Sequence, residues 1–80
     1  MISNYPPERL RSLRHRARLT QMMVVELTGI AINTLNNWET GKTRPQVRTL
    51  EKALSLYAIR IKRNEEMEKV WGLGGVKNGK

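Results

Sequence analysis

The sequence predicts an all-α domain of about five helices, the last of them extended. Apolar residues recur at intervals of three and four along most of the chain, and no stretch alternates as a strand would. Glycine and proline interrupt this pattern at Gly29, Gly41 and Pro45, which divides it into separate helices. The 80 residues leave room for one small domain with a modest core.

A first helix is expected from Pro6 to about Arg16, after a short N-terminal arm of residues 1–5. Proline suits the first helical position, where a missing N–H costs nothing. The run of arginines on this helix is either a solvated charged face or a set of phosphate contacts. The apolar face comprises Leu10, Leu13 and Ala17, and the arginines are Arg9, Arg11, Arg14, Arg16 and Arg18.

Two short helices follow. Thr20 is a good N-cap for a helix over residues 21–28, and Gly29 can adopt the left-handed conformation that ends a helix. The next helix is expected from Ile32 to about residue 39, with Ala31 as its N-cap. Its buried face is predicted to contain Leu35 and Trp38, and Ile30 and Leu35 hold the two positions of a hydrophobic staple.

The extended helix begins after the polar loop that Gly41 and Pro45 delimit. Its apolar stripe fails at residues 63–66 and then resumes, so the segment 46–71 is either one long helix or two with a bend near Asn64. The glycine-rich residues 72–80 are expected to be a flexible basic tail. The stripe comprises Val47, Leu50, Leu54, Tyr57, Ile61, Met67, Val70 and Trp71.

The charge balance indicates a polyanionic partner. Fifteen Lys and Arg against seven Asp and Glu give a net charge of +8, which suits nucleic acid or an anionic membrane. We expect a cytoplasmic protein, because no apolar stretch approaches the ~20 residues of a membrane span and the N-terminus resembles no signal peptide. The absence of Cys and the single His15 exclude thiolate and multi-histidine metal sites. No phosphate-binding glycine loop or nucleophile set is found, so we expect no cofactor and no enzyme.

One ordered set of residues carries a family resemblance over about residues 10–56. The set is Thr20-Gln21, Glu26, Gly29-Ile30, Thr34-Leu35, Trp38-Glu39, Gly41-Lys42 and Pro45. It resembles the Cro and phage-repressor (Xre-type) helix-turn-helix family of DNA-binding proteins. The resemblance implies a lambda-repressor-like domain over residues 6–71, with the helix-turn-helix at about 20–39 and a C-terminal helical extension from about 57.

The helix from Ile32 is predicted to read DNA. Three asparagines lower the propensity of so short a segment to form a helix, so a structural reason for them is hard to find. A functional reason exists, because Asn can bind adenine N6 and N7 together in the major groove. A polar surface helix is the alternative. With the resemblance added, the expected base-reading residues are Ile32, Asn33, Asn36 and Asn37, with Ile32 offered to a thymine methyl. The expected phosphate-binding residues are Gln21, Thr34, Lys42, Thr43, Arg44 and Arg11, with main-chain N–H groups of the loop assisting.

Four positions depart from the family pattern. Ala31 stands where the family usually has a capping Ser or Thr, and Thr28 stands where it usually buries an aliphatic residue. Leu27 occupies a usually exposed position, and Val25 replaces a small alanine at the helix crossing. We therefore expect the packing of the second helix to be rotated or displaced.

The resulting hypothesis is a small homodimeric autorepressor, cytoplasmic and nucleoid-associated, that binds an inverted-repeat operator in double-stranded DNA. Phage, plasmid, antitoxin, restriction–modification and anti-CRISPR regulators all fit. An antitoxin or adaptor whose C-terminal helix binds a partner such as a toxin is the main alternative, and a single-strand or RNA binder is another. The expected dimer interface, which could instead cap the monomer core, comprises Ile59, Met67, Val70 and Trp71.

Overall fold

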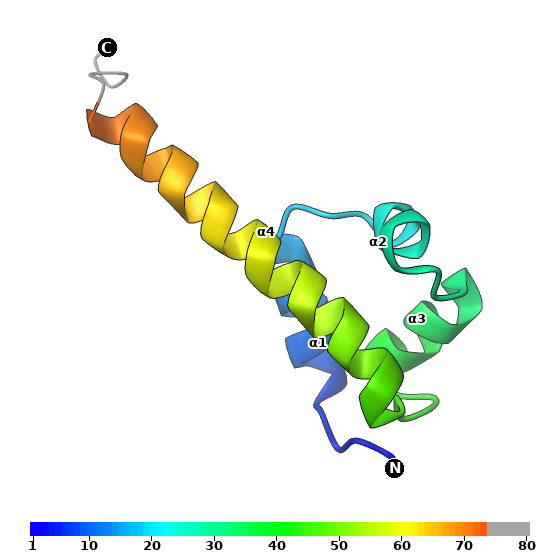
Figure 1. Cartoon of the computed structure of the whole chain (residues 1–80). Coiled ribbons are helices and arrows are strands. Elements are labelled where there is room, and N and C mark those ends of the chain that lie inside the picture. Colours follow the sequence, from blue (N-terminus) through cyan, green and yellow to red (C-terminus); the bar gives the residue numbers. More distant parts are fainter. Residues whose placement is uncertain (74–80) are drawn as a thin grey trace.

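Four α-helices make up the fold in the computed structural model, which describes the backbone of residues 1–73 and the side chains of residues 1–70. They are α1 (Pro7–Arg16), α2 (Gln21–Thr28), α3 (Ile32–Thr40) and α4 (Val47–Leu73). Figure 1 shows α4 as a long rod, with the three short helices gathered around its first half. The expected all-α architecture with an extended C-terminal helix is confirmed.

The segment after Pro45 forms one helix, so the described residues contain four helices rather than about five. The apolar stripe fails at residues 63–66 because the helix has passed the core there, and Arg63, Glu65 and Glu66 are exposed. The change in pattern therefore reports solvent exposure and not a bend. The predicted tail of residues 72–80 lies outside the described residues apart from its first two, which belong to α4.

Capping residues set the limits of the short helices. The Thr20 hydroxyl accepts a hydrogen bond from the Met23 N–H at 3.1 Å, as expected for an N-cap. Gly29 and Gly41 end α2 and α3 in the left-handed conformation, with φ of 80° and 82°. Ala31 provides no side-chain cap for α3, so that helix begins without one.

One hydrophobic core joins the four helices. α1 and α2 each pack against both α3 and α4. Tyr57 of α4, Leu10 of α1, Val24 of α2 and Leu35 of α3 are the largest fully buried side chains. The remaining core residues are Ala17, Leu19, Ile30, Trp38, Leu50 and Ala53.

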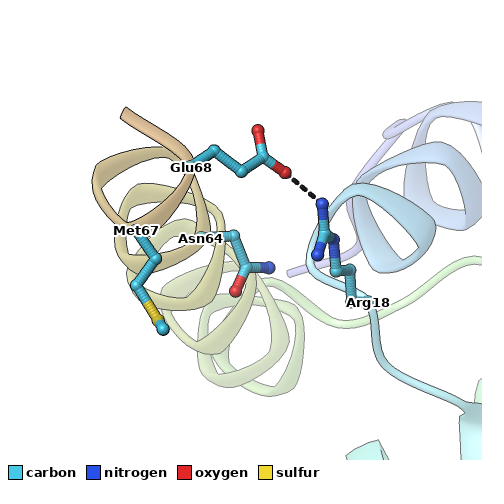
Figure 2. Close-up of a pocket in the computed structure, with 4 residues that line it drawn as sticks. All are labelled: Arg18, Asn64, Met67 and Glu68. Carbon is cyan, nitrogen blue, oxygen red and sulfur yellow. Dashed lines mark hydrogen bonds and ion pairs between the residues drawn. The ribbon is translucent and has the colours of Figure 1, made fainter. Parts of the chain in front are cut away.

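Polar contacts hold the second half of α4 against the α1–α2 connection. The Asn64 side-chain amide donates to the Ala17 carbonyl at 3.2 Å, and Arg18 pairs with Glu68. These side chains and Met67 line an open hollow of about 280 Å³ (Figure 2). Arg16 forms a further exposed ion pair with Glu65 at 3.4 Å. The half-buried Asn64 contact therefore joins α4 to the α1–α2 connection beyond the core, while the two exposed ion pairs add little to it.

The N-terminal segment lies against the start of α4 (Figure 1). The Ser3 N–H donates to the Pro45 carbonyl at 2.8 Å, and the Val47 N–H donates to the Met1 carbonyl at 2.9 Å. Ile2 and Gln46 form an isolated antiparallel bridge. Within the part of the chain that the structure describes, no helix is long and apolar enough to span a bilayer.

Candidate nucleic-acid interface

The turn between α2 and α3 is tight and fully bonded. The Gly29 N–H donates to the Val25 carbonyl at 2.8 Å, which closes α2. The Thr28 hydroxyl donates to the Val24 carbonyl at 2.6 Å and accepts from the Ile30 N–H at 3.2 Å. The polar residue at position 28 is thus satisfied by the turn itself. Thr28 stands where the family usually buries an aliphatic residue, and its neighbour Leu27 is about half exposed, as its position predicts.

α3 has two distinct faces. Leu35, Trp38 and Glu39 are buried against the other helices. Asn33, Asn36 and Thr40 are exposed on the opposite side, and the half-buried Asn37 borders them. Ile32 retains 37 % of its surface at the start of the helix, and Thr34 is half-buried on the flank. The structure therefore brings the four predicted base-reading residues onto one side of a helix whose other side is core.

Thr40 also lies on this outward side and was not predicted. Its hydroxyl donates to the Asn36 carbonyl at 2.9 Å, so it satisfies the last turn of α3. Its sequence position, seven residues after Asn33, could have indicated the shared face.

A buried ion pair lies directly behind α3. Arg14 Nε donates to Glu39 Oε2 at 2.8 Å, and Arg14 Nη2 donates to Glu39 Oε1 at 3.0 Å. Arg14 Nη1 donates to the Leu19 carbonyl at 2.9 Å. Both side chains are buried, so Arg14 is not among the arginines that can contact a phosphate. The pair fixes α3 to α1, and its two-point geometry specifies orientation as well as position.

Gln21 and Arg11 also bond to α3. Gln21 Nε2 donates to Glu39 Oε1 at 3.1 Å and, at the longer distance of 3.4 Å, to Asn36 Oδ1. Arg11 Nη1 donates to the Glu39 main-chain carbonyl at 3.0 Å, near the end of α3. Arg11 is exposed there, while the Gln21 side chain is half-buried and turned toward the protein.

Two main-chain N–H groups of the loop after α3 form hydrogen bonds within the protein. The Lys42 and Thr43 N–H groups both donate to the Asn37 carbonyl, at 2.9 and 3.4 Å. Arg44 Nη1 donates to Asn4 Oδ1 at 2.8 Å. In the unbound protein these two N–H groups are therefore engaged with Asn37. The exposed side chains of Lys42, Thr43 and Arg44 remain available.

Four of the predicted phosphate-binding side chains are exposed: Arg11, Lys42, Thr43 and Arg44. Among the other arginines of the first helix and its C-terminal turn, Arg16 and Arg18 face acids of α4. The positive charge nearest the outward face of α3 thus comes from Arg11 and from the loop, since both adjoin the end of that helix.

The second half of α4 carries apolar side chains that the monomer leaves exposed. Ile59, Met67 and Val70 retain 61 %, 50 % and 64 % of their surface. The fourth predicted interface side chain, Trp71, lies outside the described side chains. These three do not pack into the monomer core, whereas Ile61 on the same helix does pack against it.

Comparison with known proteins gives one match. The sequence profile described as a helix-turn-helix domain matches residues 8–62, which cover α1, α2, α3 and the first half of α4. No curated protein and no solved structure matches the chain.

Proposed function

The chain belongs to the helix-turn-helix domain family, and on that premise we propose that it is a repressor that reads double-stranded DNA with α3. The observation that carries this proposal is the face of α3 formed by Asn33, Asn36 and Asn37. Three amides on one side of a nine-residue helix match the donors and acceptors of the major groove. The buried residues on the other side hold that face outward.

Phosphate contacts would supply most of the affinity. Arg11, Lys42 and Arg44 are exposed around the end of α3, and the net charge of +8 favours association with a polyanion. Ile32, at the start of α3, would contact a thymine methyl. Repression then follows from occupancy, since a bound domain excludes polymerase from the same DNA. Concentration of the protein would regulate that occupancy.

The proposed dimer uses the exposed face of α4. Ile59, Arg63, Glu66 and Val70 follow one another at intervals of four, three and four, which is the a/d spacing of a helix that pairs with another helix. In an antiparallel pair centred between residues 64 and 65, Ile59 would face Val70 of the second copy. Arg63 would face Glu66 of the second copy. The face is therefore self-complementary: an apolar side chain meets an apolar side chain, and an arginine meets a glutamate.

A partner protein such as a toxin is the competing occupant of the same α4 face. The exposed apolar residues Ile59, Met67 and Val70 support this alternative as well. The charge order favours a second copy, because Arg63 and Glu66 match each other only when the two helices are antiparallel. A monomer that stays monomeric at high concentration would shift the preference to the partner protein.

DNA reading is tested by selecting a preferred duplex from a randomised library and measuring affinity for that duplex and for an unrelated one. Asn33→Ala and Asn37→Ala should each remove about 1–3 kcal/mol of discrimination and leave non-specific affinity nearly unchanged. Lys42→Ala should weaken binding to both duplexes and reduce the salt slope by about 1. Lys62→Ala on α4 is the matched control of equal charge and should change neither. If the two affinities fall together in the Asn variants, α3 is not the reader.

Dimerisation is tested by sedimentation equilibrium of the full chain. Arg63→Glu should weaken self-association by placing two acids opposite each other, and Glu66→Arg should do the same with two bases. The double variant Arg63→Glu/Glu66→Arg should restore it, because the pair is re-formed with opposite polarity. Loss in both single variants without restoration in the double variant would refute the antiparallel register.

A further inference from the structure

The N-terminal segment, residues 1–7, packs along the loop that follows α3. The Ser3 N–H donates to the Pro45 carbonyl at 2.8 Å, and the Tyr5 N–H donates to the Ser3 hydroxyl at 3.0 Å. Ser3 and Tyr5 are half-buried, whereas Asn4 between them is exposed. These contacts hold the backbone of Asn4 beside the loop and leave its side chain at the surface.

The Asn4 side chain directs its oxygen at Arg44. Arg44 Nη1 donates to Asn4 Oδ1 at 2.8 Å. A guanidinium donates through every nitrogen and accepts no hydrogen bond, so the amide atom that faces it is the oxygen. The amide nitrogen Nδ2 is bonded to the same carbon and has no hydrogen-bond partner among the described residues. Asn4 and Arg44 therefore present their remaining N–H donors side by side.

These donors border an open hollow of about 370 Å³ between the N-terminal segment and the end of α3. Tyr5, Trp38 and Thr43 also line it, and among the described lining residues Arg44 alone carries a charge. Trp38 lies near the end of α3, so the hollow adjoins the helix that we propose enters the major groove. A site with one positive charge, several N–H donors and no acid suits an anion with several acceptor atoms.

We propose that Asn4 and Arg44 together bind one backbone phosphate of the DNA beside the groove that α3 enters. Its oxygens accept from Asn4 Nδ2 and from the N–H groups of Arg44 that the Asn4 bond leaves unused. Asn4 thus becomes a phosphate-binding residue, although none of the phosphate contacts expected from the sequence lies in residues 1–5. This inference rests on the proposed function, since it requires that α3 faces DNA.

The test measures binding of the full chain to the selected duplex and to an unrelated one. Asn4→Ala should weaken both about 2- to 10-fold, the worth of one hydrogen bond, because a phosphate contact carries no sequence information. The salt dependence should stay unchanged in Asn4→Ala, since no charge is lost, whereas Arg44→Ala should reduce the salt slope by about 1. Ser55→Ala, which removes an exposed neutral group from α4, is the control and should change neither quantity.

Two further measurements separate a direct contact from a role in holding Arg44. Asn4→Ala should still weaken binding when Arg44 has already been replaced by Ala, because Asn4 Nδ2 binds the phosphate itself. The phosphates of the selected duplex are then replaced one at a time by uncharged methylphosphonate links. One link should be found whose effect on binding is smaller in Asn4→Ala and in Arg44→Ala than in wild type.

Three results would overturn the proposal. If Asn4→Ala has no effect once Arg44 is replaced, Asn4 acts only through Arg44. If the two variants couple to different links, or Asn4→Ala couples to none, the residues do not share a phosphate. A loss confined to the selected duplex would mean that Asn4 contacts a base. If wild type binds no duplex, the proposed function itself fails, which is a different result from these.

Discussion

The buried pair of Arg14 and Glu39 provides a prediction about stability that can be worked from the structure. The change is Glu39→Gln, which keeps the size of the side chain and removes its charge. Arg14 would then be a buried cation without a counter-charge. It would keep its bond to the Leu19 carbonyl and could still bond to the amide oxygen of the new residue.

The expected loss is about 3–5 kcal/mol of unfolding free energy, which is typical when one partner of a buried pair is removed. Both residues are almost fully buried: Arg14 exposes 8 % of its surface and Glu39 exposes 3 %. Water therefore cannot replace the missing charge. A domain of this size has a total stability of roughly 4–12 kcal/mol. The variant should therefore lose a large share of its stability.

The assay is urea unfolding followed by circular dichroism and by tryptophan fluorescence. With slopes of about 1–3 kcal/mol per molar urea, the midpoint of Glu39→Gln should fall by at least about 1 M. The double variant Arg14→Met/Glu39→Leu is the control, because an apolar pair of similar volume is often neutral or stabilising. A loss below about 1 kcal/mol in Glu39→Gln, or a double variant that loses as much as Glu39→Gln does, would refute the reasoning.

Three further predictions concern single sites. Thr20→Ala should cost about 1 kcal/mol in urea unfolding, because it removes the acceptor of the Met23 N–H; no loss would mean that water caps α2 equally well. Ala31→Ser should add about 0.5–1 kcal/mol by giving α3 the cap it lacks, and a decrease would indicate a clash at that turn. Burial, with a smaller contribution from the Glu39 carboxylate, raises the pKa of Tyr57 to about 12, whereas an unfolded tyrosine titrates near 10. The unfolded chain therefore loses this proton first, and stability should fall between about pH 10 and 12. Tyr57→Phe should remove that part of the pH dependence, and identical pH profiles for the two proteins would contradict the assignment.

The limits of the short helices could be predicted because their signals are local. Thr20, Gly29 and Gly41 act through bonds or backbone conformations within a few residues, so the sequence alone indicates where α2 and α3 begin and end. The outward placement of the asparagines followed from the same periodicity that places Leu35 and Trp38 inward. These features need no knowledge of the tertiary fold.

The ion pair behind α3 could not be predicted in this way, because Arg14 and Glu39 are 25 residues apart. Arg14 has the same side chain as four neighbouring arginines and differs from them only in its environment. Its position carried an unused signal, since it lies four residues after Leu10 and three before Ala17, on the buried face of α1. The bond from the Gln21 amide to Glu39 could not be predicted from the sequence either, because it depends on the position of that carboxylate. The sequence does not distinguish a continuous α4 from a bent one at residues 63–66, because an exposed helix and a bend both interrupt the apolar stripe.

Hydrogen bonds fix the loop between α3 and α4 at both of its ends. Two of its N–H groups bond to Asn37, and Pro45 and Val47 bond to residues 1–3. A loop held in this way has already lost most of its conformational entropy in the unbound protein. If it binds phosphate as we propose, binding orders only the ends of Lys42 and Arg44 and not the backbone that carries them. The N-terminal three residues would then contribute to affinity without touching the ligand, because they keep the loop in the shape that binds.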